Sequence, residues 1–275
     1  MSSLLWMCSL SGSIIAAAVI NIKLTAANCF RYKRILPLLH ALSRQPTSNQ
    51  EHLHPKLAAT VRRHLQAPSR KPAASHNTVA LELLLQELAN RPRPLVLDSF
   101  CGTGHSTATL AQRHPGHLVV GIDKSGHRLA KQPADTPENT LLLQAECEGL
   151  WQLLAERNIA ADYHYLLYPN PWPKAKHLQR RVHGCGGFFW LLQLGGRIEL
   201  RSNWQAYVEE FGVAMHLAAH PGSVSRVMPV SPLSLFELKY MESGHELWAF
   251  TGAINGSTQA LSGQPLAGCT RPATP

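Results

Sequence analysis

The chain has 275 residues, 45% of them hydrophobic, which fits a soluble globular protein with one sizeable core. Its formal net charge of +9 favours a polyanionic partner, although a solvated basic surface would give the same value. The six cysteines are scattered without any C-x-x-C pair, which argues against a zinc site and a disulfide framework and fits a reducing cytoplasm.

The first 22 residues carry no charged side chain, and a basic cluster follows at Arg31, Lys33 and Arg34. A stretch of this length could span a bilayer, but five serines and Asn21 dilute it. No positive segment precedes it, as a secretory signal would require. We therefore expect no membrane association and a cytoplasmic protein. Residues 1–45 are expected to form an N-terminal extension that is disordered or precedes the true start codon.

Apolar periodicity predicts helices alternating with short strands between residues 57 and 219. The predicted helices are Leu57–Leu65, Val79–Ala89, His105–Arg113, Leu150–Glu156, Phe188–Leu194 and Trp204–Ala219. The predicted strands are Leu95–Leu97, Leu118–Ile122, Thr140–Leu143, Tyr163–Leu167 and Arg197–Leu200. This alternation indicates an α/β domain over residues 46–252, with a mostly parallel, twisted, Rossmann-like sheet and helices on both faces.

Two further strand-like runs, Leu235–Met241 and Leu247–Thr251, flank a turn at Gly244. They predict an antiparallel hairpin at the C-terminal edge of the sheet. Residues 253–275 are rich in small residues, Gly and Pro and show no hydrophobic period, so we expect a disordered tail.

A glycine loop follows the first predicted strand, with Gly102 and Gly104 permitting a tight turn and a close approach to a ligand. Acidic residues occur at the ends of the first three strands, at Asp98, Asp123 and Glu146. A carboxylate at the second strand's end can accept both hydroxyls of a ribose. In parallel sheets, ligands bind at this carboxyl edge, so the pattern predicts a nucleoside-containing cofactor.

The identity of Asp98 favours S-adenosylmethionine (SAM) over a dinucleotide. A carboxylate at this position repels a pyrophosphate but suits the cationic amino-acid end of SAM. In addition, Thr107 occupies the place of the third small residue of a G-x-G-x-x-G loop. Asp98 would otherwise be read as a cap or turn residue.

The segment Tyr168–Lys174 (YPNPWPK) follows the fourth strand and combines three prolines with Asn170 and Trp172. Asn170 offers both a donor and an acceptor, and Trp172 offers a flat face on which a base can stack. A basic run suited to phosphates comes next, at Lys174, Lys176, His177, Arg180 and Arg181. Such a combination is typical of an enzyme that methylates a nucleic-acid base, whereas its structural alternative is a proline-rich loop with a core tryptophan.

From about Asn49 to Thr251 the sequence resembles the bacterial tRNA (guanine-N7)-methyltransferases. The specific match is PNPWPKAKHLQRR (Pro169–Arg181), similar to P-D-P-W-x-K-x-R-H-x-K-R-R in that family, and SNWQAYVEEF (Ser202–Phe211) and SLFE (Ser234–Glu237) also match. The resemblance implies a class I SAM-dependent methyltransferase fold, SAM as methyl donor without a metal, and tRNA as partner.

Carried over residue by residue, the resemblance implies SAM contacts at Asp98, Asp123, Glu146 and Asn170, and a catalytic position at Asn170. It implies substrate contacts at Lys174, Asn203, Ser234 and Glu237, to which residue type adds Trp172, Arg180 and Arg181.

The chain departs from the family pattern at three substrate positions. Asn170 and Asn203 stand where the family has aspartates, and Leu235 replaces the lysine of T-K-F-E. Guanine N7 carries a lone pair and no proton, so its methylation needs no prior deprotonation, and orientation alone could supply about 7–11 kcal/mol. A carboxylate would nevertheless bind the guanine N1–H and N2–H groups better than an amide.

These departures leave two alternatives to a tRNA guanine-N7 methyltransferase. The first is a methyltransferase for another substrate, either an RNA base amino group or a small molecule, since Asn170-Pro171-Trp172 faintly resembles the N-P-P-[YFW] motif. The second is a catalytically decayed protein that binds RNA or SAM.

Overall fold

The computed structural model describes residues 43–50, 52–68 and 72–255. All described residues belong to one compact unit. The predicted N-terminal extension and C-terminal tail lie outside the described residues, except for residues 43–45 and 253–255. In the part of the chain that is described, no helix is both long and apolar enough to cross a membrane.

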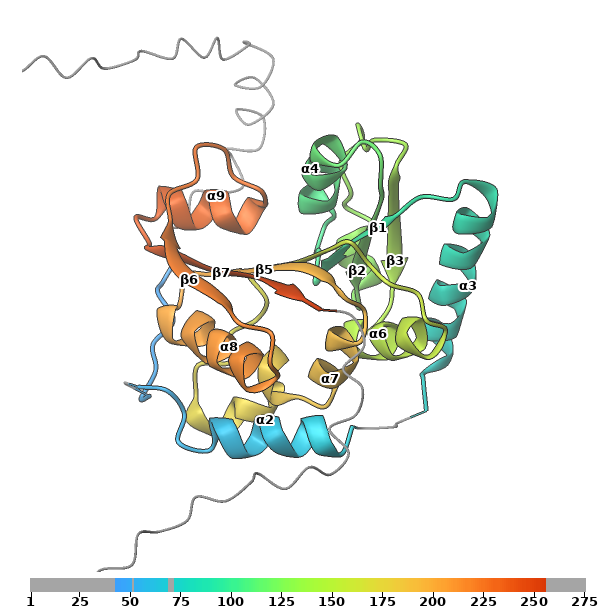
Figure 1. Ribbon diagram of the computed structural model, residues 1–275. Coiled ribbons are helices and arrows are strands. Elements are labelled where there is room, and N and C mark those ends of the chain that lie inside the picture. The colour runs from blue at the N-terminus through green and yellow to red at the C-terminus, as the bar shows by residue number, and fades with distance from the viewer. Residues whose placement is uncertain (1–42, 51, 69–71, 256–275) are drawn as a thin grey trace, which may run out of the picture. The chain divides into compact units, whose positions relative to one another are not determined.

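One mixed sheet organises the described residues, with the strand order β3-β2-β1-β4-β5-β7-β6 (Figure 1). The strands are β1 (Leu95–Ser99), β2 (Leu118–Asp123), β3 (Thr140–Gln144), β4 (Tyr163–Leu167), β5 (Gly196–Ser202), β6 (Gly222–Val227) and β7 (Leu247–Ile254). The helices are α2 (Leu57–Gln66), α3 (Ser75–Asn90), α4 (His105–Arg113), α5 (Gly126–Leu129), α6 (Cys147–Glu156), α7 (Gly187–Leu192), α8 (Gln205–Leu217) and α9 (Leu235–Glu242). Two 3₁₀ helices, η2 (Ala175–Arg180) and η3 (Val182–Gly184), follow β4.

The pairing of the strands confirms the predicted fold class. The first five strands pair in parallel, and β7 runs antiparallel to both β5 and β6. Each helix and strand predicted between residues 57 and 219 is confirmed, with small shifts at the ends. The molecule therefore has the predicted Rossmann-like sheet with a C-terminal antiparallel hairpin.

Helices cover both faces of the sheet (Figure 1). Alternate side chains of a strand such as β1 point to opposite faces. Leu95 and Leu97 pack in a large core with α2, α3, α6, α7 and α8. Val96 packs in a smaller core with Leu110 and Ala111 of α4 and with the end of α9. Because β1 is buried on both faces, it reads as a continuous apolar run in the sequence.

The predicted strand Leu235–Met241 is wrong, because these residues form helix α9. Ser234 caps the helix, and its hydroxyl accepts a hydrogen bond of 3.1 Å from the backbone N–H of Glu237. This Ser-x-x-Glu spacing is a helix start signal that outweighs the β-like composition. The strand that pairs with β7 is instead β6, which no apolar period predicts because almost all of its residues are exposed.

Candidate active site

The carboxyl ends of the five parallel strands share one edge of the sheet, and the predicted polar residues lie along it. Asp98 lies in β1, Asp123 ends β2, and Glu146 precedes α6 shortly after the end of β3. Asn170 and Asn203 follow β4 and β5. The parallel register therefore gathers residues that lie more than 100 positions apart in the sequence.

The glycine loop between β1 and α4 takes the tight path that the sequence predicts. Gly102 and Gly104 both adopt left-handed backbone conformations, with φ of +63° and +76°. The Gly102 N–H donates a hydrogen bond of 3.0 Å to Oδ2 of Asp123, which ties the loop to the end of β2. A side chain at Gly104 would meet Leu142 of β3 at 2.8 Å. The positive φ therefore favours glycine at Gly104, and an added Cβ would also require the end of the Leu142 side chain to shift.

Asp98 is fully buried beneath this loop. Its Oδ2 atom accepts hydrogen bonds of 2.6 and 2.7 Å from the hydroxyls of Ser106 and Thr107, while Oδ1 has no partner among the described residues. Burial raises the pKa of Asp98 to about 6, against the lowering effect of the two hydroxyls, and the charge of Asp123 adds to the rise. An unpaired buried carboxylate oxygen is costly, and a cationic ligand group would relieve that cost.

Asp123 is also buried, with only 2% of its surface exposed. Besides Gly102, its carboxylate accepts hydrogen bonds of 2.8 Å from the N–H of Ser125 and from the Arg128 guanidinium. Glu146 differs, because its side chain is exposed, although its backbone N–H donates to Asn77 of α3. The three predicted acids therefore present one unpaired buried oxygen, one paired carboxylate and one solvent-facing carboxylate.

The loop after β4 carries the predicted substrate residues in a constrained backbone. Tyr168 and Trp172 have positive φ values of 56° and 47°, which are rare for bulky residues. Asn170 is exposed, and its Oδ1 atom accepts a hydrogen bond of 3.3 Å from the Trp172 N–H. The Arg180 guanidinium lies 4.7 Å from the centre of the half-buried Trp172 ring. One face of the indole thus already stacks on a cation.

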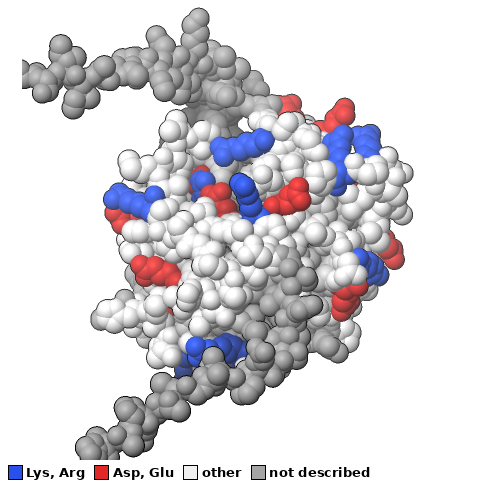
Figure 2. All heavy atoms as spheres, viewed as in Figure 1, with Lys and Arg blue, Asp and Glu red and all other residues white. Residues whose placement is uncertain are grey.

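The basic run after this loop divides into two groups. Lys174, Lys176 and Arg180 are exposed, and the half-buried His177 contacts Trp172 edge-on. Over the described part of the face in Figure 2, basic and acidic side chains are interleaved, so the net charge of the chain does not gather there. A local run of cations around η2 is therefore the stronger feature for phosphate binding.

Arg181 does not fit the phosphate contact predicted for it, because it is fully buried. Its guanidinium forms an ion pair with Glu210 of α8 and donates to the carbonyl oxygen of Trp172. It also lies over the ring of Trp204, 4.9 Å from the ring centre. The side chain thus contacts the protein interior rather than solvent.

Glu237 is likewise fully buried, so the predicted direct substrate contact does not fit its surroundings. Its carboxylate accepts hydrogen bonds from the Tyr168 hydroxyl, the Arg201 guanidinium and the Leu233 N–H. Ser234 is half-buried and its hydroxyl caps α9. Asn203 is half-buried too, with its Nδ2 atom 3.0 Å from Nδ1 of His245.

Several residues of this edge were missed by the sequence analysis. Ser106 and Thr107 bond Asp98, Arg128 pairs with Asp123, and Arg201 pairs with Glu237. Of these residues, only Ser106 and Thr107 could have been predicted from their place in the sequence, because the first turn of the helix after a glycine loop faces the end of β1.

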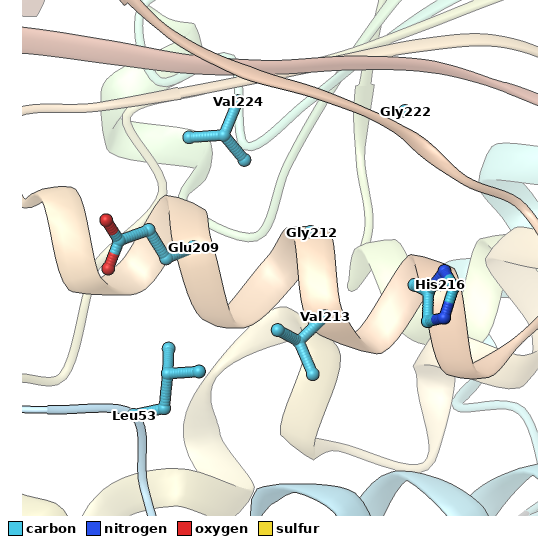
Figure 3. Close-up of a pocket in the computed structure, with 7 residues that line it drawn as sticks. All are labelled: Leu53, Glu209, Gly212, Val213, His216, Gly222 and Val224. Atoms are coloured by element: carbon cyan, nitrogen blue, oxygen red, sulfur yellow. The ribbon is translucent and has the colours of Figure 1, made fainter.

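A shallow groove of about 400 Å³ lies elsewhere, between α8 and β6 (Figure 3). Because β6 is the sheet edge opposite β3, this groove is separate from the glycine loop and its acids. Its lining residues are Leu53, Glu209, Gly212, Val213, His216, Gly222 and Val224.

The strand order, the glycine loop and the acids at successive strand ends define a SAM-dependent methyltransferase with a Rossmann-like fold. A profile of the family described as "Putative methyltransferase" matches residues 92–245, and the chain belongs to this family.

The chain is also similar to relatives with a more specific name. The chain is 31% identical over 192 residues to a tRNA (guanine-N(7)-)-methyltransferase of Sodalis glossinidius (strain morsitans), covering 64% of this chain and 79% of that protein. It is 28% identical over 170 residues to an enzyme of the same name from Nitrosospira multiformis, covering 58% and 74%. Among solved structures, the 16S rRNA methyltransferase KamB superposes with a TM-score of 0.49 at 20% identity, covering 63% of this chain and 94% of that one.

Proposed function

We propose that the protein transfers the methyl group of SAM to N7 of a guanine in tRNA. The observation that carries the proposal is the loop from Tyr168 to Lys174, where an exposed amide, an aromatic face and a basic run follow one another next to the cofactor edge. Relatives that carry the name tRNA (guanine-N(7)-)-methyltransferase support the choice of substrate.

The chain's own residues fit SAM at the glycine loop. The unpaired Oδ1 atom of Asp98 suits the ammonium group of the amino-acid end, because a buried carboxylate gains most from a charged partner. Asp123 at the end of β2 suits the ribose hydroxyls, which would share its carboxylate with Arg128, and Glu146 adds a further SAM contact. Gly102 and Gly104 leave the backbone free to approach. Bound SAM supplies an electrophilic methyl group on a sulfonium.

The substrate half orients the guanine rather than removing a proton from it. N7 already carries a lone pair, so the reaction needs no general base, and proximity and orientation account for the rate. Asn170 offers its amide oxygen to the donors on the guanine edge, and the free face of Trp172 stacks on a base. Lys174 and Arg180 bind the neighbouring phosphates.

A tRNA transcript made with 7-deazaguanosine tests the proposal, because it lacks the N7 atom but keeps every exocyclic amino group. The full chain is incubated with methyl-labelled SAM and either this transcript or an ordinary one. We expect label in the ordinary transcript alone. Equal labelling of both transcripts would favour an amino-group methyltransferase, and SAM binding with no transfer to any RNA would favour a decayed site.

The variant Asp123→Ala tests the cofactor half separately. We expect it to lower the affinity for SAM by about 10- to 100-fold, because it removes charge-assisted hydrogen bonds worth roughly 1.5–3 kcal/mol each. Asp162→Ala is the matched control, since Asp162 is an exposed acid at the opposite end of the sheet. Wild-type affinity in Asp123→Ala would refute the ribose contact.

A further inference from the structure

The loop from Tyr168 to Pro173 holds two strained residues in six positions. Tyr168 and Trp172 both lie in the left-handed region, and three prolines alternate with the residues between them. Bulky residues keep such conformations only where the surrounding structure holds them. The two strained residues flank Asn170, so whatever holds them also fixes its position.

Tyr168 is held by a buried carboxylate from a distant part of the chain. Its hydroxyl donates a hydrogen bond of 2.8 Å to Oε1 of Glu237, and the Arg201 guanidinium donates to the same oxygen at 2.6 Å. Glu237 is fully buried and its other oxygen accepts from the backbone of Leu233. The carboxylate therefore joins the end of β4, the end of β5 and the start of α9.

Trp172 is held by a buried cation. The Nε and Nη2 atoms of Arg181 both donate to the Trp172 carbonyl oxygen, at 3.3 Å each. Arg181 is itself fixed by Glu210, and by the amide oxygen of Gln50 at 3.0 Å. The segment before α2 adds a further contact, because the Ser48 hydroxyl donates to the Pro173 carbonyl at 2.6 Å.

Stability alone does not explain the buried ion pair of Arg181 with Glu210 and the second pair, of the partly buried Arg201 with the buried Glu237, beneath one short loop. A buried pair contributes little net stability, because desolvation offsets most of the attraction, and apolar side chains of similar size often serve as well. Apolar side chains would not fix the direction of the Trp172 carbonyl or the Tyr168 hydroxyl, whereas charged donors and acceptors do.

We propose that Arg181 and Glu237 are positioning residues, which clamp the two ends of the loop and thereby aim Asn170 and Trp172 at the bound base. The expected effect on kcat rests on the proposed function. The fixed position of the loop does not depend on that function, because it follows from contacts within this chain. The sequence predicted direct RNA contacts for Arg181 and Glu237. The proposal instead assigns them a role beneath the loop that contacts the RNA.

The conservative variants Arg181→Lys and Glu237→Gln test the clamp. We expect each to lower kcat on tRNA by about 10- to 100-fold, the usual consequence of a misplaced reacting group. The KM for SAM is expected to keep its wild-type value, because the residues proposed to bind the cofactor at β1 to β3 are not touched. Hydrogen–deuterium exchange of the peptide covering Tyr168 to Lys174 is expected to speed up in both variants.

Leu84→Ala is the stability control, since Leu84 is fully buried in α3 and does not belong to the loop or its clamps. At a matched loss of Tm, it should keep wild-type kcat and wild-type exchange in the loop. Unchanged kcat and exchange in both clamp variants, or an equal loss in Leu84→Ala, would overturn the inference. If the wild-type chain methylates no tRNA, the proposed function fails, and the exchange measurement still decides whether the clamp exists.

Discussion

The Thr107 hydroxyl donates a hydrogen bond of 2.7 Å to Oδ2 of Asp98, and both residues are fully buried. The Oδ1 atom of the same carboxylate has no partner in the part of the chain that the structure describes, and burial raises the pKa of Asp98 to about 6. The charge of Asp98 therefore changes within the pH range in which enzymes are usually assayed.

The affinity for SAM should therefore depend on pH. Above pH 6 Asp98 is ionised and attracts the ammonium group, and below pH 6 it becomes neutral and the attraction is lost. We expect the dissociation constant measured by calorimetry to rise as the pH falls from 7 to 5. Asp98→Asn should bind weakly at every pH, without this dependence. A variant that keeps the wild-type pH profile would show that another group titrates.

Asn170 gives a prediction of opposite sign from most active-site substitutions. A carboxylate accepts the guanine N1–H and N2–H donors more strongly than an amide does and balances the cation that forms on the ring. The gain from a charged acceptor is about 1 kcal/mol. We expect Asn170→Asp to raise kcat/KM on tRNA several-fold, and Asn170→Ala to lower it. A loss of activity in Asn170→Asp equal to that in Asn170→Ala would contradict the proposed contact.

The exposed cations of the run around η2 should govern the salt dependence of tRNA binding. Lys174→Ala and Arg180→Ala are each expected to weaken binding and to reduce the slope of log K against log salt by roughly 1. Arg226→Ala is the control, because Arg226 is an exposed arginine of the edge strand β6. Its guanidinium pairs with Glu246. Equal effects of all three substitutions on the slope would show that the charge acts without a defined site.

His164 should make the stability of the protein depend on pH. It is buried in β4, where its Nε2–H donates to the carbonyl of Gly195 at 2.7 Å. Burial lowers its pKa from 6.5 to about 4, against the raising effect of that carbonyl. Because the folded state then binds fewer protons than the unfolded chain, stability falls as the pH drops through 6.5 toward 4.

The variant His164→Gln keeps a donor for the carbonyl but does not titrate. Between pH 7 and pH 4, urea unfolding of the wild type should show a loss about 3 kcal/mol larger than that of the variant. Asp98 opposes this trend in both proteins, because an acid with a raised pKa takes up its proton first in the folded state. If the stability of the two proteins changed in parallel with pH, His164 would not be the cause of the loss of stability at low pH.

The sequence predicted the parallel half of the sheet well, because those strands are buried on both faces and end on recognisable acids such as Asp123. It did not predict β6, whose exposed residues leave no apolar period, and it took α9 for a strand although Ser234 begins a capping pattern. The local sequence pattern predicts a helix or strand correctly where one signal is strong. The prediction fails where a capping pattern indicates a helix and the composition favours a strand.

The sequence predicted the residue types of the site but not which of their side chains are buried. Arg180 and Arg181 are neighbours in one basic run, yet the first is exposed and the second is fully buried. The partners that decide this, Glu210 and Gln50, lie 29 and 131 positions away, so no local pattern contains them. The burial of Glu237 likewise depends on Tyr168, which lies 69 positions earlier.

The most direct test of the proposed function is nucleoside mass spectrometry of tRNA incubated with the purified full chain and SAM. We predict 7-methylguanosine in amounts that rise with time and enzyme, and much less of it with the Asp123→Ala variant at a SAM concentration that does not saturate the wild type. Efficient SAM binding accompanied by methylation of a different nucleoside, or by no methylation of tRNA, would contradict the proposal.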